Sequence, residues 1–581
     1  MTDSPPPDRA PAADPTGTIG SLLQVAGIPL EHDAATLAEA HALGEGAAAT
    51  LDDAALTDLG GLAFVTVDND GSRDLDQALH VRATDAGWRL HYALADASFY
   101  VRPGSACWDA ALVRGASLYA PDRAVPMLPR SLSEELVSLN PGVTRRALVF
   151  DMSIDANGAI ERCEVLRARV RSRAQLTYAG VQRFIDGDAT LDQARSTRAR
   201  ARALPLDGDE RAAVDACLRA LAALGEALQG AQRARGVMPF ERIESEIGVA
   251  GDPPRFDVEP RSRLGSERWN EQLSLACNMQ GAALLEALER DDPALEPVYR
   301  VHDAPGPSRL AALEKTLQTL SQRLGLVGPW KRERRSDVPV ADWFGALPAS
   351  APRLRRAIQR QVLRAQSGST YEGEAGRHHA LAADGYARFS SPMREIVGIH
   401  THLVLLDALG VQADGGARDT ALRDVVIGSA DASRARQKAL DRGILFAVIA
   451  SLFEQDLARE PGARWRDGTL LGLDANKLHI GLDGMALDVK LYREDLEGDT
   501  GTAWRFDTVS ATAADERDGY VLGDGVRVRV ARYDAVRERY ALQIVALGNR
   551  PTLADKRRGA LKRRGRRRPG LRRRGPSAPR G

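Results

Sequence analysis

A short acidic stretch, FVTVDNDGSRDLDQAL from Phe64 to Leu79, constrains this chain more than any other segment. Apolar residues at its two ends predict strands joined by a turn. An unpaired buried carboxylate is very costly, so a fold that gathers acids beside apolar strand ends must neutralise them. A hard divalent cation with oxygen ligands would do so. The polar groups concerned are Asp68, Asn69, Asp70, Asp74, Asp76 and Gln77.

Two interpretations of this stretch remain open from its composition. One is a Mg²⁺ site built on Asp68, Asp74 and Asp76, the arrangement that supports in-line attack on a phosphodiester. The other is a hairpin turn whose acids are simply solvated. An EF-hand is excluded, because that loop needs Gly at its sixth position and Glu at its twelfth. Counted from Asp68, the fourth residue is Gly71 and the twelfth is Leu79.

Six further motifs follow the acidic stretch, and with it they resemble, in the same order, the catalytic domain of the ribonuclease II and ribonuclease R (RNB) family. Together they span about residues 62 to 455. The motifs are HYALADASFYVRPGS (91–105), LYAPDRAVPMLPRSLSEELVSLNPGVTRRALVF (118–150), RSRAQLTYAGV (171–181), NEQLSLACN (270–278), YRVHDAP (299–305) and HHALAADGYARFSSPMREIVGIHTHL (378–403).

The resemblance implies a catalytic metal cluster. It places Asp68, Asp74 and Asp76 on three acidic positions of the family's Mg²⁺ site, with Mn²⁺ as a possible substitute. The family's fourth acid falls on Gln77, whose carboxamide oxygen can still bind a cation but lacks the negative charge. Our own inference, without a motif match, is that Asp70 partly compensates.

The resemblance also implies RNA-binding residues. Tyr119 and Tyr178 match aromatic residues that pack on nucleotides near the 3′ end, and base stacking of this kind tolerates any sequence. Arg394 in SSPMRE matches the arginine that holds the phosphates at the cleavage point, a role suited to a permanently charged, bidentate donor. Without the motif match, each would be interpreted as an ordinary core or surface residue.

Several neighbouring positions depart from the family pattern. Glu395 stands where relatives have a second basic residue, and Gly398 stands where an acid is usual, so the grip on the substrate is expected to differ. Asp441 lies close to the position of a family Glu near the catalytic centre. Glu271 keeps an acidic helix position of the RNA site, although Gln272 replaces a second acid. Outside the changed positions, His402 keeps its motif place and is expected to be structural.

The predicted fold class is α+β. We expect a leader and short helices over residues 1–60, too short for the two RNA-binding domains that precede the motif in longer relatives. A large catalytic domain with a mixed sheet and surrounding helices follows over 61–456, and then a small β-barrel (OB fold) over 460–548, where short alternating strands are separated by Asp/Gly turns. Residues 552–581 form an Arg-rich tail predicted to be disordered.

Charge, cysteine spacing and hydropathy limit partners and location. Residues 556–580 hold 13 Lys or Arg and no acid, so the neutral total conceals a basic tail suited to contact phosphate backbones. A solubility tail, or a partner for the acidic remainder, is the alternative. The four cysteines are too far apart for paired zinc ligands or a dense disulfide framework. No apolar run is long enough to span a membrane. We therefore expect a cytoplasmic protein, a monomer, without membrane contact.

These features predict a metal-dependent hydrolytic 3′-to-5′ exoribonuclease. It would degrade single-stranded RNA to nucleoside 5′-monophosphates. The alternative is a catalytically weakened RNA-binding protein that keeps the fold, motivated by Gln77, Glu395, Gly398 and Asp441. A hydrolase of some other phosphodiester is disfavoured, because the OB-like segment and the basic tail indicate a polymer.

Overall fold

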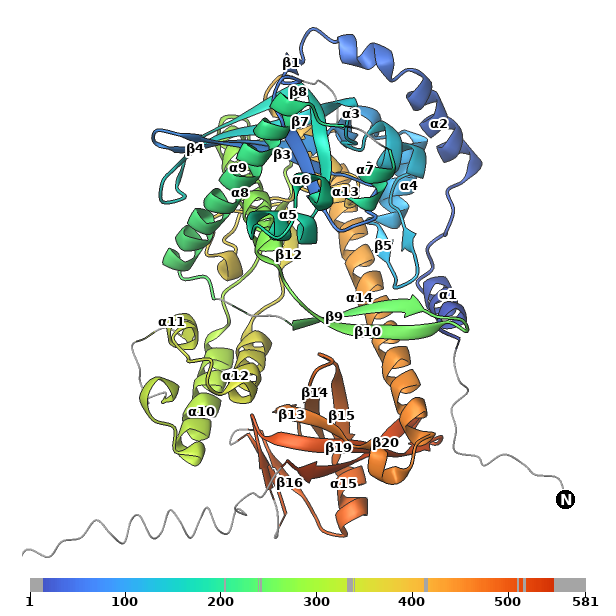
Figure 1. Ribbon diagram of the computed structural model, residues 1–581, viewed down its shortest axis with the longest axis vertical. Helices are drawn as coiled ribbons and strands as arrows, with labels where there is room; N and C mark the ends of the chain where they lie inside the picture. Colours follow the sequence, from blue (N-terminus) through green and yellow to red (C-terminus); the bar gives the residue numbers. More distant parts are fainter. Residues whose placement is uncertain are drawn as a thin grey trace, which may run out of the picture.

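The computed structural model describes residues 14–202, 205–238, 240, 243–331, 338, 340–411, 416–508, 511–515 and 519–547 (Figure 1). The predicted basic tail and most of the predicted leader lie outside these residues. In the described part, a large mixed sheet with covering helices precedes a smaller group of antiparallel strands. This confirms the predicted mixture of a large sheet and surrounding helices.

The large sheet has the strand order β1-β8-β2-β3-β4-β7, and β7 also pairs with β8. The long strand β8 pairs with both β7 and β2. The first half of β8 pairs with β7, and its last residues run parallel to β2. Strand β8 therefore links β7, at one edge of the sheet, to β2. The acidic stretch begins at the end of β2 and ends where β3 starts. The strands are β1 (Thr57–Asp58), β2 (Phe64–Asp68), β3 (Gln77–Thr84), β4 (Gly87–Ala95), β7 (Thr144–Asp155) and β8 (Ile160–Thr177).

Helices cover both faces of this sheet. Successive side chains in a strand point to opposite faces. Leu79 and Tyr92 accordingly join one core with α8 (Gly208–Ala234) and α9 (Gly265–Asp291), whereas Ala78 and Ala93 join another with α4 (Ala106–Arg114) and α13 (Ile396–Ala408). Burial of both faces fits the mostly apolar sequences of β2 and of the second half of β4.

Local sequence signals fix where the long helices begin. Asp207 accepts a hydrogen bond from Glu210 N (2.8 Å) ahead of α8, and Asp419 accepts one from Leu422 N (3.1 Å) ahead of α14 (Thr420–Leu457). Glu267 accepts one from Leu264 N (2.7 Å) at the start of α9. Each bond satisfies a backbone N–H that would otherwise lack a partner.

The remaining elements of this part are short helices, hairpins and one ribbon. They are α1 (Pro15–Val25), α2 (Ala34–Glu45), α3 (Ala97–Tyr100), β5 (Leu118–Tyr119), β6 (Ala124–Val125), α5 (Tyr178–Ile185), α6 (Leu191–Ala194), α7 (Thr197–Ala201), β9 (Ile243–Ala250), β10 (Arg255–Ser262), β11 (Tyr299–Val301), α10 (Pro307–Leu324), α11 (Val340–Gly345), α12 (Pro352–Ala365) and β12 (Thr370–Glu372).

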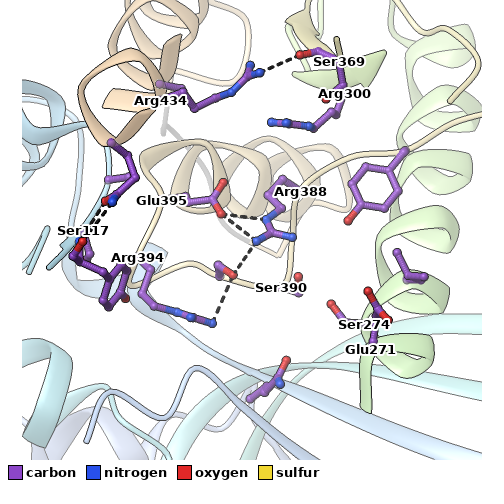
Figure 2. Close-up of a pocket in the computed structure, with 18 of the residues that line it drawn as sticks. Ser117, Glu271, Ser274, Arg300, Ser369, Arg388, Ser390, Arg394, Glu395 and Arg434 are labelled. Carbon is purple, nitrogen blue, oxygen red and sulfur yellow. Dashed lines mark hydrogen bonds and ion pairs between the residues drawn. The ribbon is translucent and has the colours of Figure 1, made fainter. Parts of the chain in front are cut away.

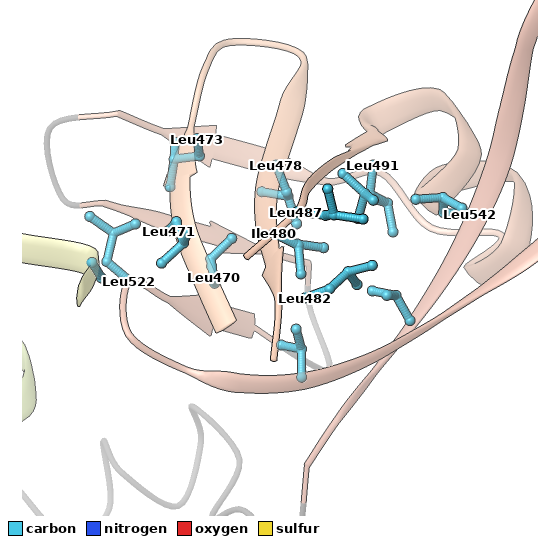
Figure 3. Packing of buried hydrophobic residues seen from close by; sticks show 14 of the residues in the cluster. Leu470, Leu471, Leu473, Leu478, Ile480, Leu482, Leu487, Leu491, Leu522 and Leu542 are labelled. Atoms are coloured by element: carbon cyan, nitrogen blue, oxygen red, sulfur yellow. The ribbon is translucent and has the colours of Figure 1, made fainter. Parts of the chain in front are cut away.

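The C-terminal strands form a five-stranded antiparallel sheet ordered β15-β14-β13-β19-β20, with α15 (Arg493–Thr500) inserted after β15. Its inward residues, among them Leu470, Ile480 and Leu542, pack into an apolar interior (Figure 3). Helix α14 runs from the large sheet to this group (Figure 1). The strands are β13 (Arg466–Leu473), β14 (Lys477–Leu482), β15 (Asp488–Tyr492), β19 (Gly525–Asp534) and β20 (Arg539–Ala546), beside a small sheet of β16 (Arg505–Asp507), β17 (Thr512–Ala514) and β18 (Gly519–Val521).

No helix of the described residues is long and apolar enough to cross a membrane.

Candidate functional site

A cavity of about 1180 Å³ lies where the sheet, α9, α14 and the loop before α13 meet (Figure 2). Segments far apart in the chain line it, including the end of β5, the start of α5 and the paired strands β11 and β12. Six residues singled out from the sequence are in its wall: Gln77, Tyr119, Tyr178, Glu271, Arg394 and Glu395.

A buried ion pair anchors one side of this cavity. Arg394 Nε donates to Asp76 Oδ2, and Met393 N donates to Asp76 Oδ1 at 2.9 Å. Asp76 is only 2% exposed, whereas the Arg394 side chain is 36% exposed and reaches the cavity. Burial raises the pKa of Asp76 in spite of the nearby guanidinium. The acid therefore fixes the arginine while the cation stays accessible to an anion.

Asp74 lies beside this pair in a crowded acidic environment. Burial, and then the charge of Asp76, raise the pKa of Asp74 to about 6, with a smaller contribution from Asp68. The three predicted metal acids thus influence one another electrostatically. An excess of negative charge of this kind is what a bound cation relieves.

The predicted metal ligands fit a divalent cation only in part. Asp68 and Asp74 offer carboxylate oxygens that make no contact with a basic side chain among the described residues. Both oxygens of Asp76 are taken, and the Gln77 carboxamide oxygen accepts from the hydroxyl of buried Tyr92. In the part of the chain that the structure describes, no three His, Cys, Asp or Glu residues form a group that could hold a metal ion.

Asp70 is directed elsewhere. It accepts from Thr197 N at 2.8 Å and from the Thr197 hydroxyl, and these bonds hold its pKa below the usual range. It therefore binds the first residue of helix α7, whose N-cap is Ser196. The inference that Asp70 compensates for Gln77 gains no support from this geometry.

The two predicted aromatic residues are held in different ways. Gln437 on α14 binds both backbone polar groups of Tyr119, accepting from its N (2.9 Å) and donating to its O (3.0 Å). The Tyr119 ring is left exposed, 46% for the residue. Tyr178 begins α5, and its hydroxyl accepts from Asn270 Nδ2 at 3.0 Å.

Glu395, expected to alter charge near the substrate, is neutralised within the wall. Arg388 donates to Glu395 Oε1 from Nε (3.0 Å) and Nη2 (2.7 Å), and the Tyr371 hydroxyl donates to Oε2 at 2.9 Å. Burial tends to raise the pKa of Glu395, but Arg388 overcomes this and lowers it. Glu395 is thus ionised, and both of its carboxylate oxygens already accept hydrogen bonds.

Gly398 has a packing role. A Cβ at this position would meet Pro392 Cα at 2.9 Å and Ser391 O at 3.1 Å. Helix α13 therefore approaches the loop that carries Arg394 too closely for any side chain there. An acid at 398 would need this loop to move.

The remaining predicted residues differ in their access to the cavity. Asp441 is not among the lining residues, and its Oδ1 accepts from Gln437 Nε2 at 2.7 Å. Glu271 lines the cavity and pairs with Arg263 (3.0 Å). His402 is fully buried, with Nε2 bound to Phe389 O at 3.0 Å.

Sequence reasoning missed several lining residues, among them Arg300, Tyr371, Arg388 and Gln437. Arg300 and Arg388 lie inside the quoted motifs. Their place in a motif could have indicated a role, but nothing in the sequence distinguished them from the other motif residues. Gln437 lies one helical turn before Asp441, the residue selected on α14.

Comparison with known proteins identifies the family. The RNB domain model matches residues 56–410, more than half of the chain, and the chain belongs to this family. Ribonuclease R of Vibrio parahaemolyticus is 33% identical over 347 residues, which cover 59% of this chain and 38% of the relative. The chain thus spans less than two thirds of the length of such relatives.

Solved structures share the fold. RNase R of Mycoplasma genitalium, in complex with ribose-methylated single-stranded RNA, superposes with a TM-score of 0.78 at 22% identity, over 92% of this chain and 78% of that one. Yeast Ssd1, described as a pseudonuclease, gives a TM-score of 0.62 at 14% identity, over 86% and 58%.

Proposed function

We propose that this protein is a hydrolytic 3′-to-5′ exoribonuclease that degrades single-stranded RNA to nucleoside 5′-monophosphates. The observation that carries the proposal is the accessible guanidinium of Arg394, fixed by buried Asp76 in a cavity that Tyr119 and Tyr178 also line. A positioned arginine binds a phosphate through two N–H groups, and aromatic faces accept bases without sequence preference. Membership of the RNB family and similarity to ribonuclease R support the assignment.

In the proposed reaction, water attacks phosphorus and the bond to the 3′ oxygen breaks, which leaves a 5′-monophosphate. Arg394 holds the phosphate and offsets the charge that develops on its oxygens. Tyr119 and Tyr178 hold the terminal nucleotides. Asp76 keeps the guanidinium oriented, which places the phosphate at a fixed position.

We include dependence on Mg²⁺, or Mn²⁺ as an alternative, in the proposal. Asp68 and Asp74 are the residues available to hold the ion. Such an ion supplies a nucleophilic water and charge neutralisation in phosphodiester hydrolysis. The raised pKa of Asp74 supports a cation at this place, whereas the occupied oxygens of Asp76 and Gln77 indicate a smaller protein ligand set than four.

The C-terminal strands are proposed to be an OB-type RNA-binding domain over 460–548, following a catalytic domain over 61–456 and an extension over 1–60. A five-stranded sheet with β13 between β14 and β19, and a helix after β15, supports this assignment. A monomer in the cytoplasm, with the basic segment 552–581 contacting RNA, completes the proposal.

The test is a 5′-labelled single-stranded RNA incubated with the pure protein in Mg²⁺, Mn²⁺ or EDTA. We expect a ladder that shortens from the 3′ end, needs the metal and disappears with Asp76→Asn. Asp85→Asn, in the exposed turn between β3 and β4, is the matched control and should keep the ladder. Cleavage unaffected by EDTA, or internal cuts, would contradict the proposal.

A second candidate is an RNA-binding protein that has given up catalysis. The observation in its favour is Gln77, which brings no charge and whose oxygen is taken by Tyr92. The shared fold with a protein described as a pseudonuclease is compatible with it. Intact RNA in every lane, shifted on a native gel by both the wild-type protein and Asp76→Asn, would establish this candidate instead.

A further inference from the structure

Arg388 is a second cation in the wall, close to Arg394. It precedes α13, and its side chain is 29% exposed toward the cavity. Glu395 receives two of its nitrogens on one oxygen, and Tyr371 occupies the other oxygen. Arg388 Nη1 makes no hydrogen bond with the described residues. The acid thus fixes the orientation of the guanidinium and leaves donors unused.

Two guanidinium groups meet at one hydroxyl. Nη2 of Arg388 lies 3.2 Å from Ser391 Oγ, and Nη2 of Arg394 lies 3.5 Å from the same atom. Ser391 is buried. Two positive charges this close repel each other, so each guanidinium needs an acidic partner. Glu395 stabilises Arg388, and Asp76 stabilises Arg394. Preorganised cations that converge on one point form a binding site for an anion with several oxygens.

The wall continues as a cationic surface beyond Arg388. Arg300 stacks on Tyr371, with its guanidinium carbon 4.7 Å from the ring centre, and has no carboxylate within ion-pair distance among the described residues. Arg300, Arg388 and Arg394 follow one another along the cavity, with Glu271 on the opposite side (Figure 2). That acid is paired with Arg263, so it does not compete for these three arginines.

We propose that Arg388 is a second phosphate-binding residue of the cavity and that Glu395 is its positioning residue. The ligand is a phosphodiester of the RNA strand, held beside the phosphate that Arg394 holds. The inference rests on the proposed function, because it requires that RNA enter this cavity. It assigns Glu395 a role in orienting Arg388. Without Arg388, the carboxylate of Glu395 would repel the RNA strand.

The test measures RNA affinity in EDTA, where no cleavage is expected. The full-length protein is titrated with a fluorescent single-stranded RNA at several KCl concentrations. Arg388→Gln/Glu395→Gln removes both charges of the pair, so net charge is unchanged. Arg418→Gln/Asp292→Asn removes an exposed pair (2.7 Å) elsewhere and is the matched control.

We expect the Arg388→Gln/Glu395→Gln protein to bind about ten- to a hundredfold more weakly, the usual loss for a charged hydrogen bond. The slope of log K against log salt should fall by about 0.7, the value for one phosphate contact on a single strand. Arg388→Lys, which keeps the charge without the fork, should restore most of the slope but only part of the affinity. The control pair should change neither quantity.

The possible outcomes distinguish a failure of this inference from a failure of the proposed exoribonuclease function. Wild-type affinity and slope in Arg388→Gln/Glu395→Gln would overturn the inference and leave the exoribonuclease proposal intact. If Arg388→Lys lost as much of the salt slope as the double variant, the inference would also be overturned. A positive charge at position 388 would then not be what contacts the phosphate. A wild-type protein that neither binds nor shortens RNA would overturn both.

Discussion

Arg394 and Asp76 are 318 residues apart in the chain, yet Arg394 Nε donates directly to Asp76 Oδ2 in the cavity wall. The carboxylate is buried and the guanidinium is partly exposed. The pair therefore links the two motifs that the sequence singled out, the acidic stretch and SSPMRE. It also joins stability to the proposed phosphate binding in one contact.

Removal of Arg394 should cost both stability and activity. Arg394→Gln leaves the buried Asp76 carboxylate without its cation, so the free energy of unfolding should fall by about 3–5 kcal/mol and cleavage should be lost. In Arg394→Gln/Asp76→Asn the buried charge is gone, so stability should largely return while cleavage stays absent. Urea unfolding and the ladder assay measure the two effects. Equal instability of both variants would show that the charge pair is not the cause.

A charge at position 77 should alter the requirement for metal. Gln77→Asp adds a carboxylate near Asp74 and Asp76, which should lower the Mg²⁺ concentration at half-maximal rate, because opposite charges attract more strongly than a neutral ligand. Without metal the same variant should be less stable, since like charges repel. Titration of rate with Mg²⁺, and melting with and without the ion, provide the measurements. A metal requirement identical to that of the wild-type protein would argue against an ion beside residue 77.

Stability should fall on acidification because of buried histidine. His402 is fully buried, its Nδ1 makes no hydrogen bond with the described residues, and burial lowers its pKa to about 4. The unfolded pKa is about 6.5, so between about pH 6.5 and 4 the unfolded chain binds more protons than the folded one. The folded state should lose about 2 kcal/mol from this residue between pH 7 and pH 5.

The measurement is the free energy of unfolding against pH for the wild-type protein and for His402→Gln. The variant side chain is neutral and can still donate to Phe389 O. Its pH profile should be flatter by the amount given above. A profile parallel to the wild type would mean that His402 is not responsible. His400, whose pKa burial also lowers to about 4, should contribute the same sign of slope.

Tyr119 should act through its ring. Tyr119→Ala removes the stacking face and should weaken RNA binding by about 1–3 kcal/mol, whereas Tyr119→Phe keeps the face and should bind almost as well as the wild type. RNA affinity in EDTA tests both variants. A loss in Tyr119→Phe as large as that in Tyr119→Ala would assign the role to the hydroxyl instead.

The sequence predicted most of the framework because its signals are local. The helices α8 (Gly208–Ala234) and α9 (Gly265–Asp291), for example, have capping residues and apolar stripes that are encoded within each segment. Short alternating strands were expected over 460–548, and the structure has the strands β13 to β20 there.

Side-chain pairing at the site could not be predicted in the same way. Glu395 was predicted to alter the charge near the substrate, but the sequence alone did not indicate that Arg388, seven residues earlier, is its partner. Asp70 belongs to the same acidic stretch as Asp74, yet it bonds to Thr197, 127 residues further on. Long-range geometry decides which partner each acid of a cluster meets.

Gln437 should matter more than Asp441, the α14 residue selected from the sequence. Gln437 binds both backbone groups of Tyr119 and lines the cavity, whereas Asp441 only contacts Gln437. Gln437→Ala removes two hydrogen bonds, each worth about 1 kcal/mol, and frees the residue that carries the stacking ring. KM should therefore rise about tenfold while kcat changes little. Asp441→Ala should raise KM less, because Gln437 keeps its bonds to Tyr119. A larger effect in Asp441→Ala would show that this acid contacts RNA itself.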